Sequence, residues 1–191
     1  MLLNSLNAKL SQEIYVTCLK AITDYQQYNP YVLFFYLDFD YDVPCKPKIC
    51  LGFNTEAHFK KRFKEIGDEI EARWYIPCIL SENHRSFHIF EESIFSKWLE
   101  NFNFAAQDID DEDEQEDIIT HNIKIILVNV IRELHNHESL NNLEVPHLPI
   151  LILEEMEECD YSEENLSMNQ QANGSFLPIN FIHFYNNILN N

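Results

Sequence analysis

The sequence predicts an α+β domain in which a mainly antiparallel sheet is covered by about five helices. The sheet would consist of a hairpin over 31–53 and a central strand over 148–153. Apolar residues alternate with a period of two in the first segment, and the second segment is a continuous apolar run. Apolar residues recurring every three or four positions elsewhere predict the helices. A chain of 191 residues fits a single domain over 1–191 with its own core.

The segment 31–42 shows the clearest strand pattern, because alternate side chains of a strand point to opposite faces. One side can be buried along its length and consists of Tyr31, Leu33, Phe35, Leu37, Phe39 and Tyr41. The other side starts apolar and ends in Asp38, Asp40 and Asp42. A short turn with two prolines leads to a second strand over 48–53. So short a connection predicts an antiparallel hairpin.

Helical periodicity predicts helices over about 5–27, 56–74, 90–102 and 118–135, with a last helix after Pro178. The helix over 56–74 would be interrupted at Gly67, and its buried stripe would comprise Phe59, Phe63, Ile66, Ile70 and Trp74. The helix over 118–135 has the widest apolar stripe and should be the most buried. Residues 148–153 form an apolar run typical of a central strand covered on both faces. Ser162 can cap a short acidic segment, and 169–174 is predicted to be polar and loose.

The formal net charge of −19 bears on partners and compartment. It disfavours nucleic acid and anionic membrane surfaces, and it favours a basic protein, a cation, or solubility alone. Neither a leader sequence nor an apolar run of membrane-spanning length is present, so we expect a soluble, cytoplasmic protein of bacterial type. The five cysteines form no C-x-x-C pair and are expected to be reduced thiols, with Cys18 and Cys50 in the core.

The sequence lacks the motifs of phosphate binding, dinucleotide binding and metal binding. Three glycines, dispersed along the chain, do not make a phosphate-binding loop or a dinucleotide fingerprint. His135 and His137 are two positions apart at a helix end and do not share a face, so no metal ligands are assigned. We therefore expect no cofactor and no catalytic residue, and an enzyme is the less favoured class.

Carboxylates are the remaining candidates. The acidic run 108–117 predicts a mobile loop over about 105–117, because dense like charges repel. If the ends of the strands over 31–42 and 148–153 lie side by side, their carboxylates would form a negative face. The candidate partner-binding residues are Asp38, Asp40, Asp42, Asp110, Asp111, Glu112, Asp113, Glu154 and Glu155.

Two functions compete for these carboxylates. A face that docks a basic protein needs only exposure, and this non-enzymatic binding function is the preferred hypothesis. A metal-assisted hydrolase using Asp38, Asp40 and the glutamates of 154–158 requires the carboxylates to be forced together. A structural domain without a specific partner is the third possibility.

The order of elements in the first half, together with Asn54-Thr55-Glu56 and Arg73-Trp74, resembles a family of uncharacterised bacterial α+β domains. The resemblance covers roughly residues 10–100. Some members of that family lie in toxin and immunity gene neighbourhoods, so the resemblance implies an immunity-type protein that neutralises a basic partner. It implies no catalytic residues, and it leaves the acidic run 108–117 unexplained.

Overall fold

The computed structural model describes residues 2–38, 48–75, 87–88, 94–100, 111–136, 148–154 and 161–190. Within these ranges lie seven α-helices: α1 (Leu2–Tyr25), α2 (Glu56–Ile66), α3 (Glu69–Trp74), α5 (Ile94–Leu99), α6 (Glu112–Asn136), α8 (Glu163–Asn173) and α9 (Ile179–Leu189). The strands are β1 (Pro30–Asp38), β2 (Lys48–Thr55), β3 (Phe87–His88) and β4 (Ile150–Glu154). The short 3-10 helices η1 (Gln26–Tyr28) and η3 (Gly174–Phe176) follow α1 and α8. The predicted α+β class is confirmed.

The four strands form one mixed sheet in the order β3-β2-β1-β4. β1 pairs antiparallel with β2, which confirms the predicted hairpin, and β2 pairs antiparallel with β3. β1 and β4, however, run parallel. Two of the three strand pairings are therefore antiparallel, as predicted for a mainly antiparallel sheet. Among the described strands, however, β4 takes an outer position, so the predicted central place of 148–153 is wrong.

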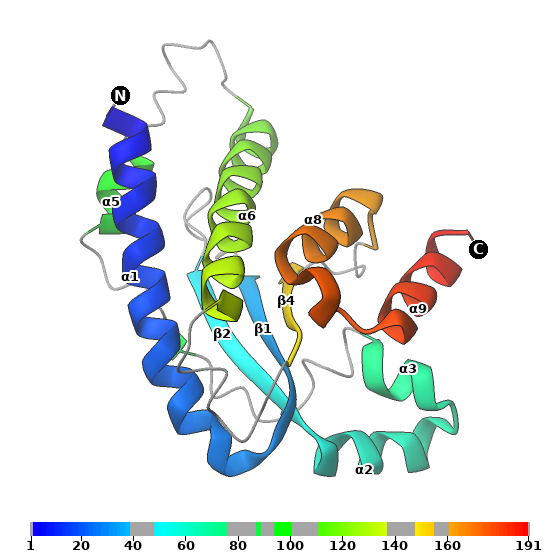
Figure 1. The fold of residues 1–191 in the computed structure, drawn as a ribbon. Coiled ribbons are helices and arrows are strands. Elements are labelled where there is room, and N and C mark those ends of the chain that lie inside the picture. The colour runs from blue at the N-terminus through cyan, green and yellow to red at the C-terminus, as the bar shows by residue number, and fades with distance from the viewer. Residues whose placement is uncertain are drawn as a thin grey trace.

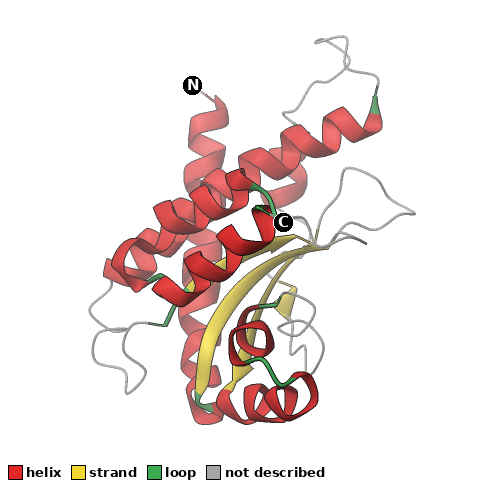
Figure 2. Cartoon of the chain, turned by 90° about the vertical axis from the view of Figure 1, so that its right-hand side faces the viewer, coloured by secondary structure: helices red, strands yellow, loops and turns green. Residues whose placement is uncertain are grey.

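The period of two in β1 separates two hydrophobic cores, one on each face of the sheet. Leu33, Phe35 and Leu37 pack in a core with α1, α5 and α6, whereas Val32 and Phe34 pack in a core with α2, α3 and α9 (Figure 1). Figure 2 shows the strands curving between these helical layers. Tyr31 was predicted to share a side with Leu33 but lies in the second core, because the register with β2 shifts between Pro30 and Val32.

β4 is covered on both faces, as its continuous apolar run predicts. Ile150 and Ile152 belong to the first core, and Leu151 and Leu153 belong to the second. The segment predicted to be polar and loose is instead the end of α8, which lies along β4. The predicted looseness is wrong because Asn165, Asn169 and Asn173 are buried, and the last two bond the backbone of β4.

The helix predicted over 56–74 is divided in two. Gly67 ends α2 with φ of 83°, a left-handed conformation that glycine adopts without strain, and Asp68 caps α3. The break turns α3 out of line with α2, so Phe63 and Ile70 are exposed instead of joining the predicted stripe.

Helix α6 lies between α1 and α8 and is buried along most of its length, as its wide apolar stripe predicts. Cys18 and Cys50 are buried free thiols, in agreement with the prediction for both. No helix in the part of the chain that the structure describes has the length and apolar content that a membrane span requires.

Candidate functional site

The first turns of α6 carry exposed carboxylates, those of Asp111, Glu112, Asp113 and Glu114. Asp111 caps the helix, because its Oδ1 accepts a hydrogen bond from the Glu114 N–H at 3.1 Å. The prediction of a mobile loop is therefore wrong for 112–117, which are helical, while 105–110 lie outside the described residues. The helix dipole favours negative charge at this end, and this offsets part of the repulsion that suggested a loop.

Glu116 lies half-buried on the same turns, beside these carboxylates. Burial raises the pKa of the Glu116 carboxyl above its ordinary value of 4.5, and the neighbouring Asp113 and Asp117 raise it further. Both neighbouring carboxylates are exposed. The start of α6 is thus a place where negative charges lie close enough to disfavour one another.

The N-terminus of α8 adds two more exposed carboxylates, Glu163 and Glu164. Ser162 caps this helix by accepting a hydrogen bond from the Asn165 N–H at 3.1 Å. Glu164 Oε1 lies 2.9 Å from His121 Nδ1 of α6, and both side chains are about half exposed. This contact brings the start of α8 beside α6, one helical turn from Asp117.

The carboxyl ends of β1 and β4 lie side by side, because these strands are parallel and Leu37 is paired with Glu154. The backbone thus meets the condition on which the predicted negative face depended. In the other pairing of β1, Asp38 lies opposite Lys48 of β2. The start of α8 belongs to the same end of the sheet, since Asn173 bonds Ile150 and Asn169 bonds Ile152 farther along β4.

The starts of α6 and α8 thus both lie toward the end of the molecule to which β1 and β4 run (Figure 1). We call this surface the acidic face and define it by its described, exposed residues: Asp111, Glu112, Asp113, Glu114, Asp117, Glu163 and Glu164.

The predicted partner-binding residues are distributed in three ways. Asp111, Glu112 and Asp113 lie on the acidic face. Asp38 and Glu154 hold positions at the adjoining strand ends. The remaining four lie outside the described residues: Asp40, Asp42, Asp110 and Glu155.

Glu163 and Glu164 were missed as site residues. The sequence carried a signal for their helix, because a serine followed by two glutamates is typical of a capped helix start.

The described residues also bear on metal and thiol chemistry. Among the described residues, no group of three or more His, Cys, Asp or Glu side chains is arranged to hold a metal ion. Cys18 is fully buried, and burial raises the pKa of its thiol far above its ordinary value, so this cysteine is inert as a nucleophile.

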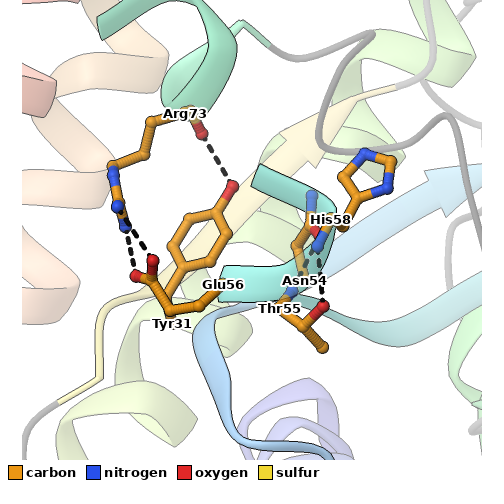
Figure 3. A network of polar contacts seen from close by, with 6 residues as sticks. All are labelled: Tyr31, Asn54, Thr55, Glu56, His58 and Arg73. Atoms are coloured by element: carbon orange, nitrogen blue, oxygen red, sulfur yellow. Dashed lines mark hydrogen bonds and ion pairs between the residues drawn. The ribbon is translucent and has the colours of Figure 1, made fainter. Parts of the chain in front are cut away.

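The motif residues that carry the family resemblance form a separate polar cluster (Figure 3). Arg73 binds Glu56 through two contacts, Nη1 to Oε1 at 2.7 Å and Nη2 to Oε2 at 3.2 Å. The guanidinium carbon of Arg73 lies 3.8 Å from the ring centre of Phe59 and 4.7 Å from that of Tyr31. The Tyr31 hydroxyl donates to the Arg73 carbonyl oxygen at 2.9 Å. We call this group the arginine clamp: Tyr31, Glu56, Phe59 and Arg73.

The arginine clamp and its neighbours fasten α2 and α3 to β1. Thr55 Oγ1 accepts a hydrogen bond from the His58 N–H at 3.2 Å and so caps α2, while Trp74 is buried against Phe181 of α9. The motif is therefore engaged in holding the fold together. Comparison of the chain with protein-family models, curated proteins and solved structures gave no match.

Proposed function

We propose that the chain is a cytosolic, non-enzymatic binding protein whose acidic face docks a basic protein partner. The observation that carries the proposal is that the exposed carboxylates at the starts of α6 and α8 lie toward the same end of the molecule. A partner with lysines and arginines would offset the repulsion from Asp113 and Asp117, which adds to the effect of burial on the pKa of Glu116. The net charge of −19 supports the same class of partner through long-range attraction.

The physics of such docking makes a specific demand on kinetics. Complementary charges accelerate encounter, by about tenfold to a thousandfold at low ionic strength. Screening over roughly 8 Å at physiological salt removes much of this gain for exposed groups. Association with the partner should therefore be fast at low salt and slow steeply as salt is added.

An immunity-type protein that neutralises a basic toxin is the sharpest version of this proposal. It rests on the resemblance carried by Asn54-Thr55-Glu56 and Arg73-Trp74. Under this version the partner is the product of a neighbouring gene. The arginine clamp would hold the scaffold, and the acidic face would make the contact.

The test compares two double variants with the same net charge. Asp113→Lys with Glu114→Lys reverses two charges on the acidic face. Glu69→Lys with Glu71→Lys reverses two exposed carboxylates in the first turn of α3, which matches the helix position as well as the charge. Binding of each to the neighbouring gene product is measured by biolayer interferometry at low and at high salt.

We expect the α6 double variant to associate at least about tenfold more slowly than the wild type at low salt. The α3 double variant should keep most of the wild-type rate, because its reversed charges lie outside the acidic face. Equal losses in the two variants would mean that only net charge matters. No binding of the wild type at low salt would remove the proposal.

A metal-dependent hydrolase is the second candidate, and one observation favours it. The backbone positions of Asp38 and Glu154 adjoin at the carboxyl ends of parallel strands, a common place for ligand sites in α/β sheets. Calorimetric titration of the folded protein with Mg²⁺, Mn²⁺, Ca²⁺ and Zn²⁺ separates the two candidates. Heats that disappear in an Asp38→Asn variant would favour the hydrolase, and titrations without heat would exclude it.

A further inference from the structure

The outer edge of β4 is closed by side-chain amides of a helix. Asn173 Oδ1 accepts a hydrogen bond from the Ile150 N–H at 2.8 Å, and its Nδ2 donates to the Ile150 carbonyl oxygen at 2.9 Å. Asn169 does the same at Ile152, with distances of 2.8 Å and 3.1 Å. Each amide thus satisfies one donor and one acceptor of the strand, as a neighbouring strand would.

The spacing of the two asparagines explains why a helix can do this. Four residues of a helix rise about 6.0 Å, and two residues of a strand rise about 6.6 Å. Asparagines at i and i+4 of the helix therefore meet residues j and j−2 of the strand. The backbone N–H and C=O groups of these strand residues point away from β1. Each Nδ2 also donates to the carbonyl oxygen four residues earlier, Asn165 for Asn169 and Asn169 for Asn173, at 3.0 Å in both cases. We call this arrangement the amide ladder, made of Asn169 and Asn173.

Helix α8 is positioned to seal the sheet edge on both sides. Leu166 packs in the core beneath α9, whereas Met168 and Ala172 pack in the core beneath α6. At the far end His135 Nε2 lies 3.1 Å from Asn173 Oδ1, and its ring stacks on Phe176 with centroids 4.3 Å apart. The ladder residues are 1% and 2% exposed, so water does not substitute for them.

We propose that the amide ladder takes the place of the next strand and prevents a second copy of this chain from pairing with the edge of β4. The sequence of β4 provides the reason such protection is needed. Ile150, Leu151, Ile152 and Leu153 form an uncharged, strongly apolar run with high strand propensity, the composition that favours edge-to-edge pairing. An uncovered edge of this kind would add a strand from another copy. This inference is independent of the proposed function.

The experiment removes the amides one at a time. Asn169→Ala removes the amide within α8. Asn173→Ala removes the amide at the last residue of α8, where a substitution disturbs the helix least. Gln170→Ala is the matched control, because it deletes an exposed amide from the same helix. Molar mass is measured by light scattering across a range of protein concentrations. Amide hydrogen exchange at Ile150 and Ile152 is followed at the same concentrations.

In dilute solution we expect exchange at Ile150 and Ile152 to accelerate roughly tenfold or more in the ladder variants, because each loses a buried hydrogen-bond partner. As concentration rises, the molar mass of these variants should increase, and protection at the two amides should return. The control should stay monomeric with wild-type exchange.

Three results would overturn the proposal. The first is that both ladder variants fold and remain monomeric at every concentration. The second is association without recovery of protection at Ile150 and Ile152, since the contact would then lie elsewhere. The third is complete unfolding of both variants, which would make the ladder a requirement for folding instead of a cover over an edge.

Discussion

The arginine clamp and the acidic face use charge in opposite ways. In the clamp, Arg73 and Glu56 neutralise each other, and the guanidinium is sandwiched against aromatic rings with only 18% of its side chain exposed. On the acidic face, carboxylates of one sign lie on exposed helix turns and disfavour one another at Glu116. The clamp thus contributes to stability, whereas the acidic face offers charge to a partner at some cost to stability.

The largest expected effect comes from breaking the clamp. Arg73→Ala should lower the free energy of unfolding by about 2–3 kcal/mol, because it removes a two-contact ion pair and stacking on two rings. The free energy of unfolding of Arg73→Lys should lie between those of Arg73→Ala and the wild type, since an ammonium keeps the charge but not the planar geometry. Urea denaturation followed by circular dichroism measures both.

Arg132→Ala provides the control for the clamp. Arg132 is an exposed arginine whose Nε donates a single hydrogen bond to the Gln171 carbonyl oxygen at 2.8 Å. Its removal should cost about 1 kcal/mol or less. If Arg73→Ala costs no more than Arg132→Ala, the clamp contributes nothing beyond an ordinary surface contact.

Sequence patterns predicted which face each strand side chain takes, but not which elements bond each strand. The period of two in β1 reports which face each side chain takes, and the two cores confirm it for Leu33 and Phe34. The apolar run of β4 reports coverage of both faces but carries no information on hydrogen-bond neighbours. The outer position of β4 therefore could not be predicted from its apolar run. Asn169 and Asn173 supply the hydrogen bonds that a second neighbouring strand would have made.

The candidate site was predictable to a similar degree. Asp111, Glu112 and Asp113 were identified from charge density alone, although the same density suggested a loop where a capped helix forms. Glu163 and Glu164 join them only because α8 is anchored on β4 and packs against α6. Such tertiary neighbours follow from the packing of whole elements, which short motifs do not encode.

A smaller effect distinguishes the helix caps of the two regions. Thr55→Ala removes the cap of α2 and should cost about 1 kcal/mol. Asp111→Ala removes the cap of α6 but should cost less, because it also takes a negative charge out of a run of exposed acidic residues. Thermal unfolding of the two variants gives the difference in stability.

Thr23→Ala is the control for loss of a hydroxyl that caps no helix. It deletes a hydroxyl bonded to the Leu19 carbonyl within α1 and should leave stability unchanged or raise it.

Equal losses in Thr55→Ala and Asp111→Ala would contradict the idea that the acidic face carries a cost to stability. A larger loss in Asp111→Ala would reverse it, since attraction to the helix dipole would then outweigh repulsion from the neighbouring carboxylates. Either result would leave the cap itself intact as an explanation for why 112–117 are helical.

The smallest effect is a dependence on pH at Glu116. Because the folded pKa of this carboxyl is raised above its ordinary 4.5, the folded state holds the proton more tightly than the unfolded state. Its contribution to stability is therefore fully present below pH 4.5 and is lost as pH rises through the raised value. Glu116→Gln imitates the protonated form and should raise the melting temperature slightly at pH 7 but not at pH 4.

Glu114→Gln is the control, because it replaces an exposed carboxylate on the same turns, and it should show no such gain at pH 7. A Glu116→Gln advantage that persists unchanged at pH 4 would mean that packing, and not the burial and repulsion of a charged carboxylate, distinguishes this position.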